Sequence, residues 1–316
     1  MSTDDNRITL PAIRLMLILL LIVIAPVTQA ETFRHERGEI ELEHPPQRIV
    51  ALNWAAAEAL ILLGVTPTGV ADLDGYPVWV KEPAMPPGVQ NVGIRASPSL
   101  EAIHQLKPDL IITSAQLAPA YEQLKDIAPT YVISVYDKGL DPFQQAKIML
   151  QALGDMLDRS KKADRILADL ERSLAANRKR LANAGLHDKP IALVSFMDNR
   201  HVRIMTRNGL LSAALEGLGL TNAWTEEGNF WGFSLVGLEV LAPMKDARLV
   251  VISPTAPGLA DQLAASPFWQ HLPMVNDEEI YQVETVWSFG GIHAVQRLAE
   301  NLTDQLLQGG AHNVRR

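Results

Sequence analysis

The sequence contains no cysteine among its 316 residues. This absence excludes disulfide bonds, thiol catalysis and zinc or iron–sulfur sites with cysteine ligands. It also excludes a lipid-modified cysteine behind an export signal. Positive charge is scarce as well, because 36 acidic residues outnumber 28 basic ones and the net charge is −8. With no basic stripe carrying interleaved aromatics, we expect no nucleic-acid-binding surface.

Signatures of catalysis and of metal binding are also lacking. The sequence has no G-x-S-x-G elbow, P-loop, H-E-x-x-H or G-x-G-x-x-G motif. Its eight histidines are scattered, and none stands three or four positions from another. We therefore expect neither an enzyme nor a protein-ligated metal, although distant residues that converge in space stay an alternative for both.

Long apolar runs are limited to the N-terminus. Arg7 and Arg14 precede the apolar run from Leu15 to Ala25, which Pro26 breaks before small residues end at Ala30. Eleven residues of helix rise only about 16 Å, too little for a bilayer core of about 30 Å. The pattern predicts a signal peptide over residues 1–30 with cleavage near Ala30. An uncleaved anchor is the alternative.

The rest of the chain reads as two α/β halves. Short apolar runs, predicted as strands, alternate with helices of about ten residues, which is typical of parallel sheets covered by helices. The unit "SLEAIHQLKPDLII" (Ser99–Ile112) is echoed 138 residues later by "GLEVLAPMKDARLVVI" (Gly237–Ile252). We predict an N-terminal lobe over 31–158 and a C-terminal lobe over 185–316.

A long helix is predicted between the halves, over residues 159–184. This stretch has no Pro or Gly and carries one narrow apolar stripe. About 39 Å of helix could cross both lobes and would limit hinge motion, because such a helix bends poorly. An ordinary surface helix is the alternative.

Tryptophans are the most informative of the few aromatic residues. Five of them stand in predicted loops, two directly after strands: Trp54, Trp79, Trp224, Trp231 and Trp287. Loops at the carboxyl ends of parallel strands form the binding crevice of open sheets. We therefore predict a shared cleft for a bulky organic ligand, with loop packing as the alternative. Trp269 is interpreted as a packed anchor.

Arg95 stands just before the Ser99–Ile112 unit. A loop guanidinium beside a helix start can hold an anionic oxygen with two hydrogen bonds. A surface salt bridge would place the same residue type there equally well.

Several segments together resemble one family, the periplasmic substrate-binding proteins of ABC importers for iron–siderophore complexes and cobalamin. Within it, the chain is similar to the ferric hydroxamate-binding group over about residues 45–308. The segments that carry the resemblance are "RIVALNW", "YPVWVKEP", "VGIRASPSLE", "NAWTEEGNFWG" and "TVWSFGG". The resemblance implies a class III fold of two α/β lobes joined by one long helix, with the ligand cleft between them.

The resemblance also implies roles for single residues. Arg95 matches an arginine that hydrogen-bonds iron-bound hydroxamate oxygens, and the five tryptophans match cleft aromatics. Phe289 stands where a tyrosine is usual. Leu117 replaces a second cleft tyrosine, and Tyr121 is a candidate substitute for it. The implied protein is a periplasmic monomer with no intrinsic cofactor, which binds iron only as the siderophore complex and passes it to a membrane permease with its ATPase.

The residues favour a hydroxamate ligand. Fe(III) with three hydroxamates is neutral at the metal, so one arginine among tryptophans suits it better than it suits a highly anionic tris-catecholate. A citrate-type or catecholate siderophore, haem and cobalamin stay alternatives, as does a secreted enzyme on the same scaffold.

Glu101 and Glu239 occupy matching places in the two echoed units. A carboxylate in the first turn of a helix is favoured by the helix dipole, which would explain either residue alone. The resemblance implies that the two dock onto arginines of the permease, one from each lobe, where two separated charges fix orientation better than one.

Overall fold

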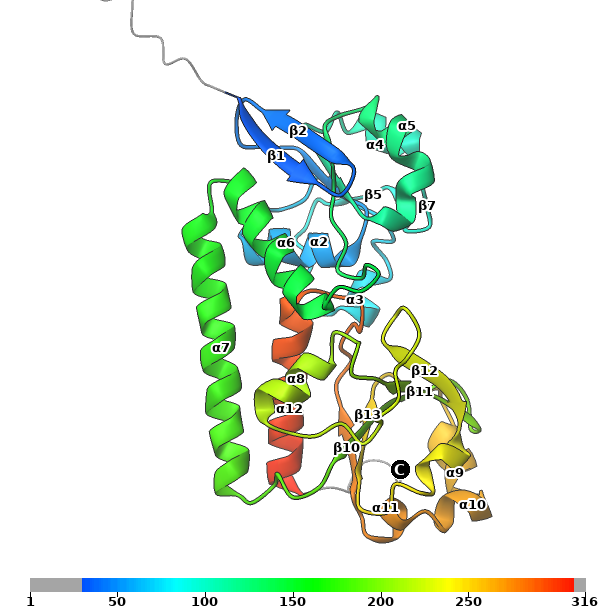
Figure 1. The fold of residues 1–316 in the computed structure, drawn as a ribbon. Helices are drawn as coiled ribbons and strands as arrows, with labels where there is room; N and C mark the ends of the chain where they lie inside the picture. Colours follow the sequence, from blue (N-terminus) through cyan, green and yellow to red (C-terminus); the bar gives the residue numbers. More distant parts are fainter. Residues whose placement is uncertain (1–29, 310–316) are drawn as a thin grey trace, which may run out of the picture.

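Two five-stranded sheets, each covered by helices, organise residues 30–309, which are the residues that the computed structural model describes (Figure 1). The predicted signal peptide lies outside this range. None of the helices between residues 30 and 309 combines the length and the apolar character that a bilayer-spanning helix needs.

The sheet of the first lobe is fully parallel, in the order β5-β4-β3-β8-β9. Its strands are β3 (Ile49–Ala51), β4 (Gly69–Val70), β5 (Gln90–Asn91), β8 (Leu110–Thr113) and β9 (Thr130–Val132). Its helices are α2 (Trp54–Leu62), α3 (Tyr76–Trp79), α4 (Leu100–Gln105), η1 (Ala115–Ala120), α5 (Tyr121–Lys125) and α6 (Pro142–Met156). A two-stranded ribbon of β6 (Gly93–Ile94) and β7 (Ser97–Pro98) precedes α4.

The sheet of the second lobe is mixed, in the order β12-β11-β10-β13-β14. Its strands are β10 (Ile191–Phe196), β11 (His201–Met205), β12 (Phe233–Gly237), β13 (Arg248–Ile252) and β14 (Ile280–Val283). Its helices are α8 (Ser212–Leu218), η2 (Leu238–Leu241), α9 (Leu259–Ala264), α10 (Pro267–Gln270), α11 (Pro273–Asn276) and α12 (Ile292–Gln308). The α/β class with parallel strands is confirmed. Two strands were not predicted: β11, which pairs antiparallel with both its neighbours, and β12 at the sheet edge. Nor was the N-terminal hairpin of β1 (Glu31–His35) and β2 (Gly38–Leu42).

The echoed units differ in their helices. Ser99 caps α4 by accepting a hydrogen bond from the Ala102 amide. Gly237 has no side chain to do so and ends strand β12, so only the single turn η2 follows. Pro108 stands nine positions after Ser99, whereas Pro243 stands six after Gly237. A proline cannot continue the helical hydrogen bonds, so the second unit has less room for a helix.

A long helix, α7 (Ser160–Asn183), runs beside both lobes (Figure 1). It contacts α6 of the first lobe and both α8 and α12 of the second. Leu170, Leu174 and Leu181 are buried along one side, as the apolar stripe predicts. The helix therefore bridges the lobes along its full length.

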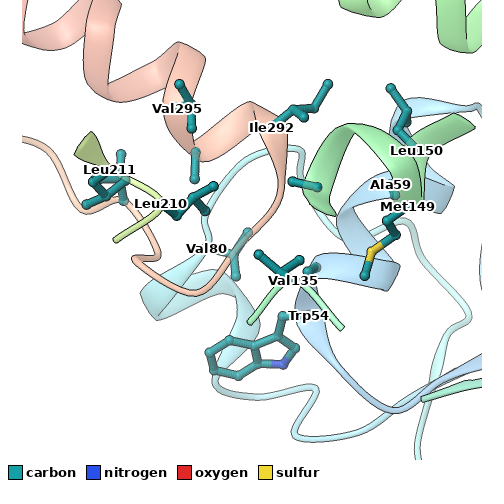
Figure 2. Packing of buried hydrophobic residues seen from close by; sticks show 14 of the residues in the cluster. Trp54, Ala59, Val80, Val135, Met149, Leu150, Leu210, Leu211, Ile292 and Val295 are labelled. Atoms are coloured by element: carbon teal, nitrogen blue, oxygen red, sulfur yellow. The ribbon is translucent and has the colours of Figure 1, made fainter. Parts of the chain in front are cut away.

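The apolar core continues from one lobe into the other. Figure 2 shows Trp54 and Val80 of the first lobe in the same packed cluster as Leu210 and Ile292 of the second. Relative motion of domains is the usual expectation only where their interface is small or polar. The continuous apolar core between the lobes therefore disfavours large relative motion.

Candidate functional site

A cavity of about 370 Å³ opens between the lobes. This volume is within the usual range for pockets that take small organic ligands. The first lobe contributes residues just beyond β3 and β8, and the second contributes β11, β12 and the segment after β14. The lining residues are Leu52, Asn53, Trp54, Arg95, Ser114, Gln116, Leu117, Arg203, Trp231, Phe233, Trp287 and Phe289.

Arg95 reaches the cavity from the turn between β6 and β7. Its Nε lies 3.2 Å from Oδ2 of Asp72. Its Cζ stands 3.8 Å from the ring centroid of Trp54 and 4.9 Å from that of Trp287. The ion pair and the two rings hold the guanidinium in place. Arg95 therefore forms the salt bridge that was the alternative for it, and it also lines the cavity.

The aromatic wall is a chain of edge-to-face contacts. The ring centroid of Trp287 lies 4.9 Å from Trp54 and 5.0 Å from Phe289, and Phe289 lies 5.4 Å from Trp231. Trp79 touches Trp287 at 6.0 Å but stays 43% exposed and outside the cavity lining. These contacts make a preformed and mostly apolar surface.

The prediction that these tryptophans lie in loops is wrong for two of them. Trp54 is the first residue of α2 and is buried, and its Nε1 donates to the carbonyl oxygen of Ala71. Trp79 is the last residue of α3. Trp269 is buried in the second lobe, as an anchor would be.

Besides Trp79, two further predicted site residues do not line the cavity. Tyr121 is buried against the N-terminal hairpin, 6.1 Å from His35 and with the Arg37 guanidinium over its ring. Trp224 packs on the core of the second lobe and borders a separate surface groove beside Lys245. Leu117 does line the cavity, so the wall at that point carries no hydroxyl.

Arg203 is the main lining residue that sequence reasoning missed. It lies on β11 between Val202 and Ile204, which are both fully buried. This alternation of buried and open positions in "HVRIM" is the period-two signal of a strand and would have placed Arg203 on the face opposite the core. Asn53 and Gln116 were missed because no motif marks them.

The segment that carries Trp287 and Phe289 is held at its far end by Glu58 of α2. The carboxylate accepts hydrogen bonds from the amides of His293, at 3.0 Å, and Gly291, at 3.3 Å, at the start of α12. A Cβ on residue 291 would stand 2.6 Å from Oε1 of Glu58, so any larger residue would displace this hydrogen-bonded carboxylate. Burial raises the pKa of Glu58 to about 7, although the two amide hydrogen bonds oppose the shift.

Tyr136 and Arg297 also make hydrogen bonds between the lobes, near the segment that carries Trp287 and Phe289. The Tyr136 hydroxyl donates to the carbonyl oxygen of Ser288 and accepts from the Leu210 amide, both at 2.9 Å. Nη1 of Arg297 on α12 donates to the carbonyl oxygen of Val80, also at 2.9 Å. The aromatic wall is thus fixed by hydrogen bonds from both lobes.

The two predicted docking carboxylates are exposed. Glu101 lies in the first turn of α4 and accepts a hydrogen bond from Nε2 of Gln105 at 3.2 Å. Glu239 lies in the turn η2, with its carboxylate beside Gly237. Nothing in the described chain occupies either carboxylate with an ion pair.

No cluster of three or more His, Asp or Glu side chains suited to a metal ion is present within residues 30–309. The cavity lining itself contains none of these residue types. Its polar groups are guanidinium, amide and hydroxyl, which can bind the outer oxygens of a ligand.

Comparisons with known proteins agree on one family. A family profile described as periplasmic binding protein matches residues 49–285. The chain is 35% identical over 245 residues to the iron(3+)-hydroxamate-binding protein FhuD of Escherichia coli, covering 78% of this chain and 82% of that protein. It is 30% identical over 294 residues to the Fe(3+) dicitrate-binding periplasmic protein FecB of Escherichia coli, covering 91% and 93%. The crystal structure of the Fe3+–Desferal-bound siderophore-binding protein FhuD from Vibrio cholerae is similar at a TM-score of 0.80, with 27% identity over 84% of this chain and 99% of that one.

Proposed function

Because the chain belongs to the periplasmic binding protein family, we propose that it captures a ferric hydroxamate siderophore and delivers it to an ABC importer. Residues 31–158 and 185–316 act as the two arms of the ligand site, with residues 159–184 as their rigid link. The protein binds its ligand without changing it chemically. It acts after export, once residues 1–30 have been removed.

The observation that carries the proposal is the setting of Arg95. Its guanidinium lies in a preformed aromatic cavity, fixed by Asp72 and two tryptophan rings. Donors held this way can bind the oxygens on the outside of a chelate at little entropic cost. The lining has no carboxylate or imidazole, so the iron would arrive with its own hard oxygen ligands and keep them.

The site residues we assign are Arg95 for the hydroxamate oxygens and Trp54, Trp231, Trp287 and Phe289 for the organic periphery, with Trp79 at the rim. Desferal is a hydroxamate, and the Vibrio cholerae relative is described with its ferric complex. A hydroxamate ligand accords with that relative and with the Escherichia coli one.

Delivery would use Glu101 and Glu239. Each is exposed, one on each lobe. A pair of separated carboxylates orients a partner that carries matching arginines and speeds encounter. We propose that the partner is the inner-membrane permease with its ATPase and that the binding protein reaches it as a monomer.

Intrinsic tryptophan fluorescence tests the proposed ligand class. Ferrioxamine B, ferric dicitrate, a ferric tris-catecholate and cobalamin are titrated in turn. Quenching should report binding, because three tryptophans line the cavity. We expect ferrioxamine B to bind most tightly of the four, because its hydroxamate oxygens suit the fixed guanidinium of Arg95. Recovery of the same chelate by mass spectrometry is expected after incubation. Tighter binding of any other ligand, or a chemically altered chelate, would contradict the proposal.

A further inference from the structure

Arg203 enters the cavity from the second lobe, opposite the lobe that supplies Arg95. It stands across from Ser195 on β10 and Leu235 on β12 in the sheet register. Its neighbours in the strand face the core, so its own side chain faces the cavity. Its Cζ lies 5.1 Å from the ring centroid of Phe233.

The charge of Arg203 is uncompensated. Arg95 is paired with Asp72, whereas no Asp or Glu between residues 30 and 309 forms an ion pair with Arg203. The nearby Asp198 at the β10–β11 turn is engaged by His201 instead, at 2.9 Å. With no carboxylate in the lining, the cavity carries one positive charge in excess.

A half-buried cation against an aromatic wall is partly desolvated, so it gains more from a counter-ion than an exposed cation does. A neutral tris-hydroxamate chelate supplies none. A chelate that bears a carboxylate supplies one and can accept two parallel hydrogen bonds from the guanidinium.

We propose that Arg203 is a specificity-determining residue that binds a carboxylate on the ligand, so that the site selects anionic ferric hydroxamate chelates over neutral ones. The inference rests on the proposed function, because it names which hydroxamate chelates the cavity prefers. The two arginines then have separate roles: Arg95 binds the hydroxamate oxygens, and Arg203 binds a carboxylate on the outer part of the chelate.

A series of three ligands with one ferric core tests this. Ferrioxamine B has a cationic terminal amine, its N-acetyl derivative is neutral, and its N-succinyl derivative ends in a carboxylate. Dissociation constants are measured by fluorescence quenching for the wild type. We expect the succinyl form to bind about tenfold tighter than the acetyl form, since hydrogen bonds to a charged group are stronger than those between neutral groups. The free amine form should bind most weakly.

Matched variants isolate the residue. Arg203→Gln should bring the succinyl and acetyl forms to within about twofold of each other, and Arg203→Lys should keep part of the preference. Arg200→Gln removes an exposed arginine of the same hairpin, outside the lining, and should keep the full preference. Circular dichroism spectra confirm that each variant is folded.

Several outcomes would overturn the inference. One is equal binding of the succinyl and acetyl forms by the wild type. Another is an equal loss for all three ligands in Arg203→Gln, which would show that the residue only packs on Phe233. Binding of the three chelates without any charge preference would leave the proposed function standing and remove the role of Arg203. Binding of none of them would overturn the proposed function and this inference together.

Discussion

Replacing Glu58 with glutamine should change how the stability of this protein depends on pH. The carboxyl is 1% exposed and its pKa is raised by burial from 4.5 to about 7. Below pH 4.5 it is protonated in both the folded and the unfolded chain, so the stability it contributes is complete there. Between pH 4.5 and 7 the unfolded chain releases this proton while the folded chain keeps it, so the free energy of unfolding falls as pH rises.

The magnitude follows from the difference between the two pKa values. Each unit of pKa difference corresponds to 1.36 kcal/mol, so the free energy of unfolding falls by roughly 3 kcal/mol once pH exceeds 7. Glutamine stays neutral throughout and still offers one oxygen to the amides of Gly291 and His293. The unfolding free energy of Glu58→Gln minus that of the wild type should therefore rise by roughly 3 kcal/mol from pH 4.5 to pH 8.

Urea unfolding followed by circular dichroism at pH 4.5, 6 and 8 measures this difference. His293, Arg297 and Tyr76 are the charged or titratable groups that interact with Glu58 or stand at its hydrogen bonds. Burial lowers the pKa of His293, which weakens the fold as pH falls, but this effect is common to both proteins and largely cancels. Glu101→Gln, on an exposed helix surface, controls for the loss of one negative charge. A difference that stays constant across this pH range would refute the reasoning.

Three further substitutions test the site, its support and the docking surface. Arg95→Ala should weaken ferrioxamine B binding by about tenfold or more, because charge-assisted hydrogen bonds are lost, while the melting temperature changes little; unchanged affinity by fluorescence would remove Arg95 from the site. Gly291→Ala should lower the free energy of unfolding by about 1–3 kcal/mol in urea titrations, because its Cβ would stand 2.6 Å from Oε1 of Glu58. An unfolding midpoint equal to that of the wild type would show that the alanine does not disturb this carboxylate. The double variant Glu101→Ala with Glu239→Ala should bind ligand with normal affinity yet abolish uptake of radioactive ferric siderophore by cells. Normal uptake would exclude the docking role and leave only the favourable interaction of each carboxylate with a helix start.

Elements with a strong local signal could be predicted from the sequence. Local sequence patterns predict three elements: the strand before Trp54, the helix that Ser99 caps, and the long Pro- and Gly-free helix α7. They do so because propensity, capping and periodicity act over a few neighbouring residues. Arg95 was expected in the cleft because of the family resemblance of the segment around it, and the structure does place it in the cavity lining.

What could not be predicted depends on contacts between distant residues. Tyr121 lies only four positions from Leu117, yet its ring turns away because the N-terminal hairpin offers a packing surface there. Trp224 faces the core of its own lobe for the same kind of reason. The alternation in "HVRIM" marks Arg203 as a strand residue on the open face, but the sequence does not show that β11 pairs between β10 and β12 and so brings that face to the cavity.

The apolar core shared by the two lobes has a consequence for transport rates. If the lobes keep one arrangement with or without ligand, the spacing of Glu101 and Glu239 is the same in empty and loaded molecules. The permease would then bind the empty and the loaded protein with nearly equal affinity. Empty protein would therefore act as a competitive inhibitor of loaded protein. Import would follow the loaded fraction in the compartment rather than the total amount of protein, so overproducing the binding protein under iron chelate scarcity would slow uptake.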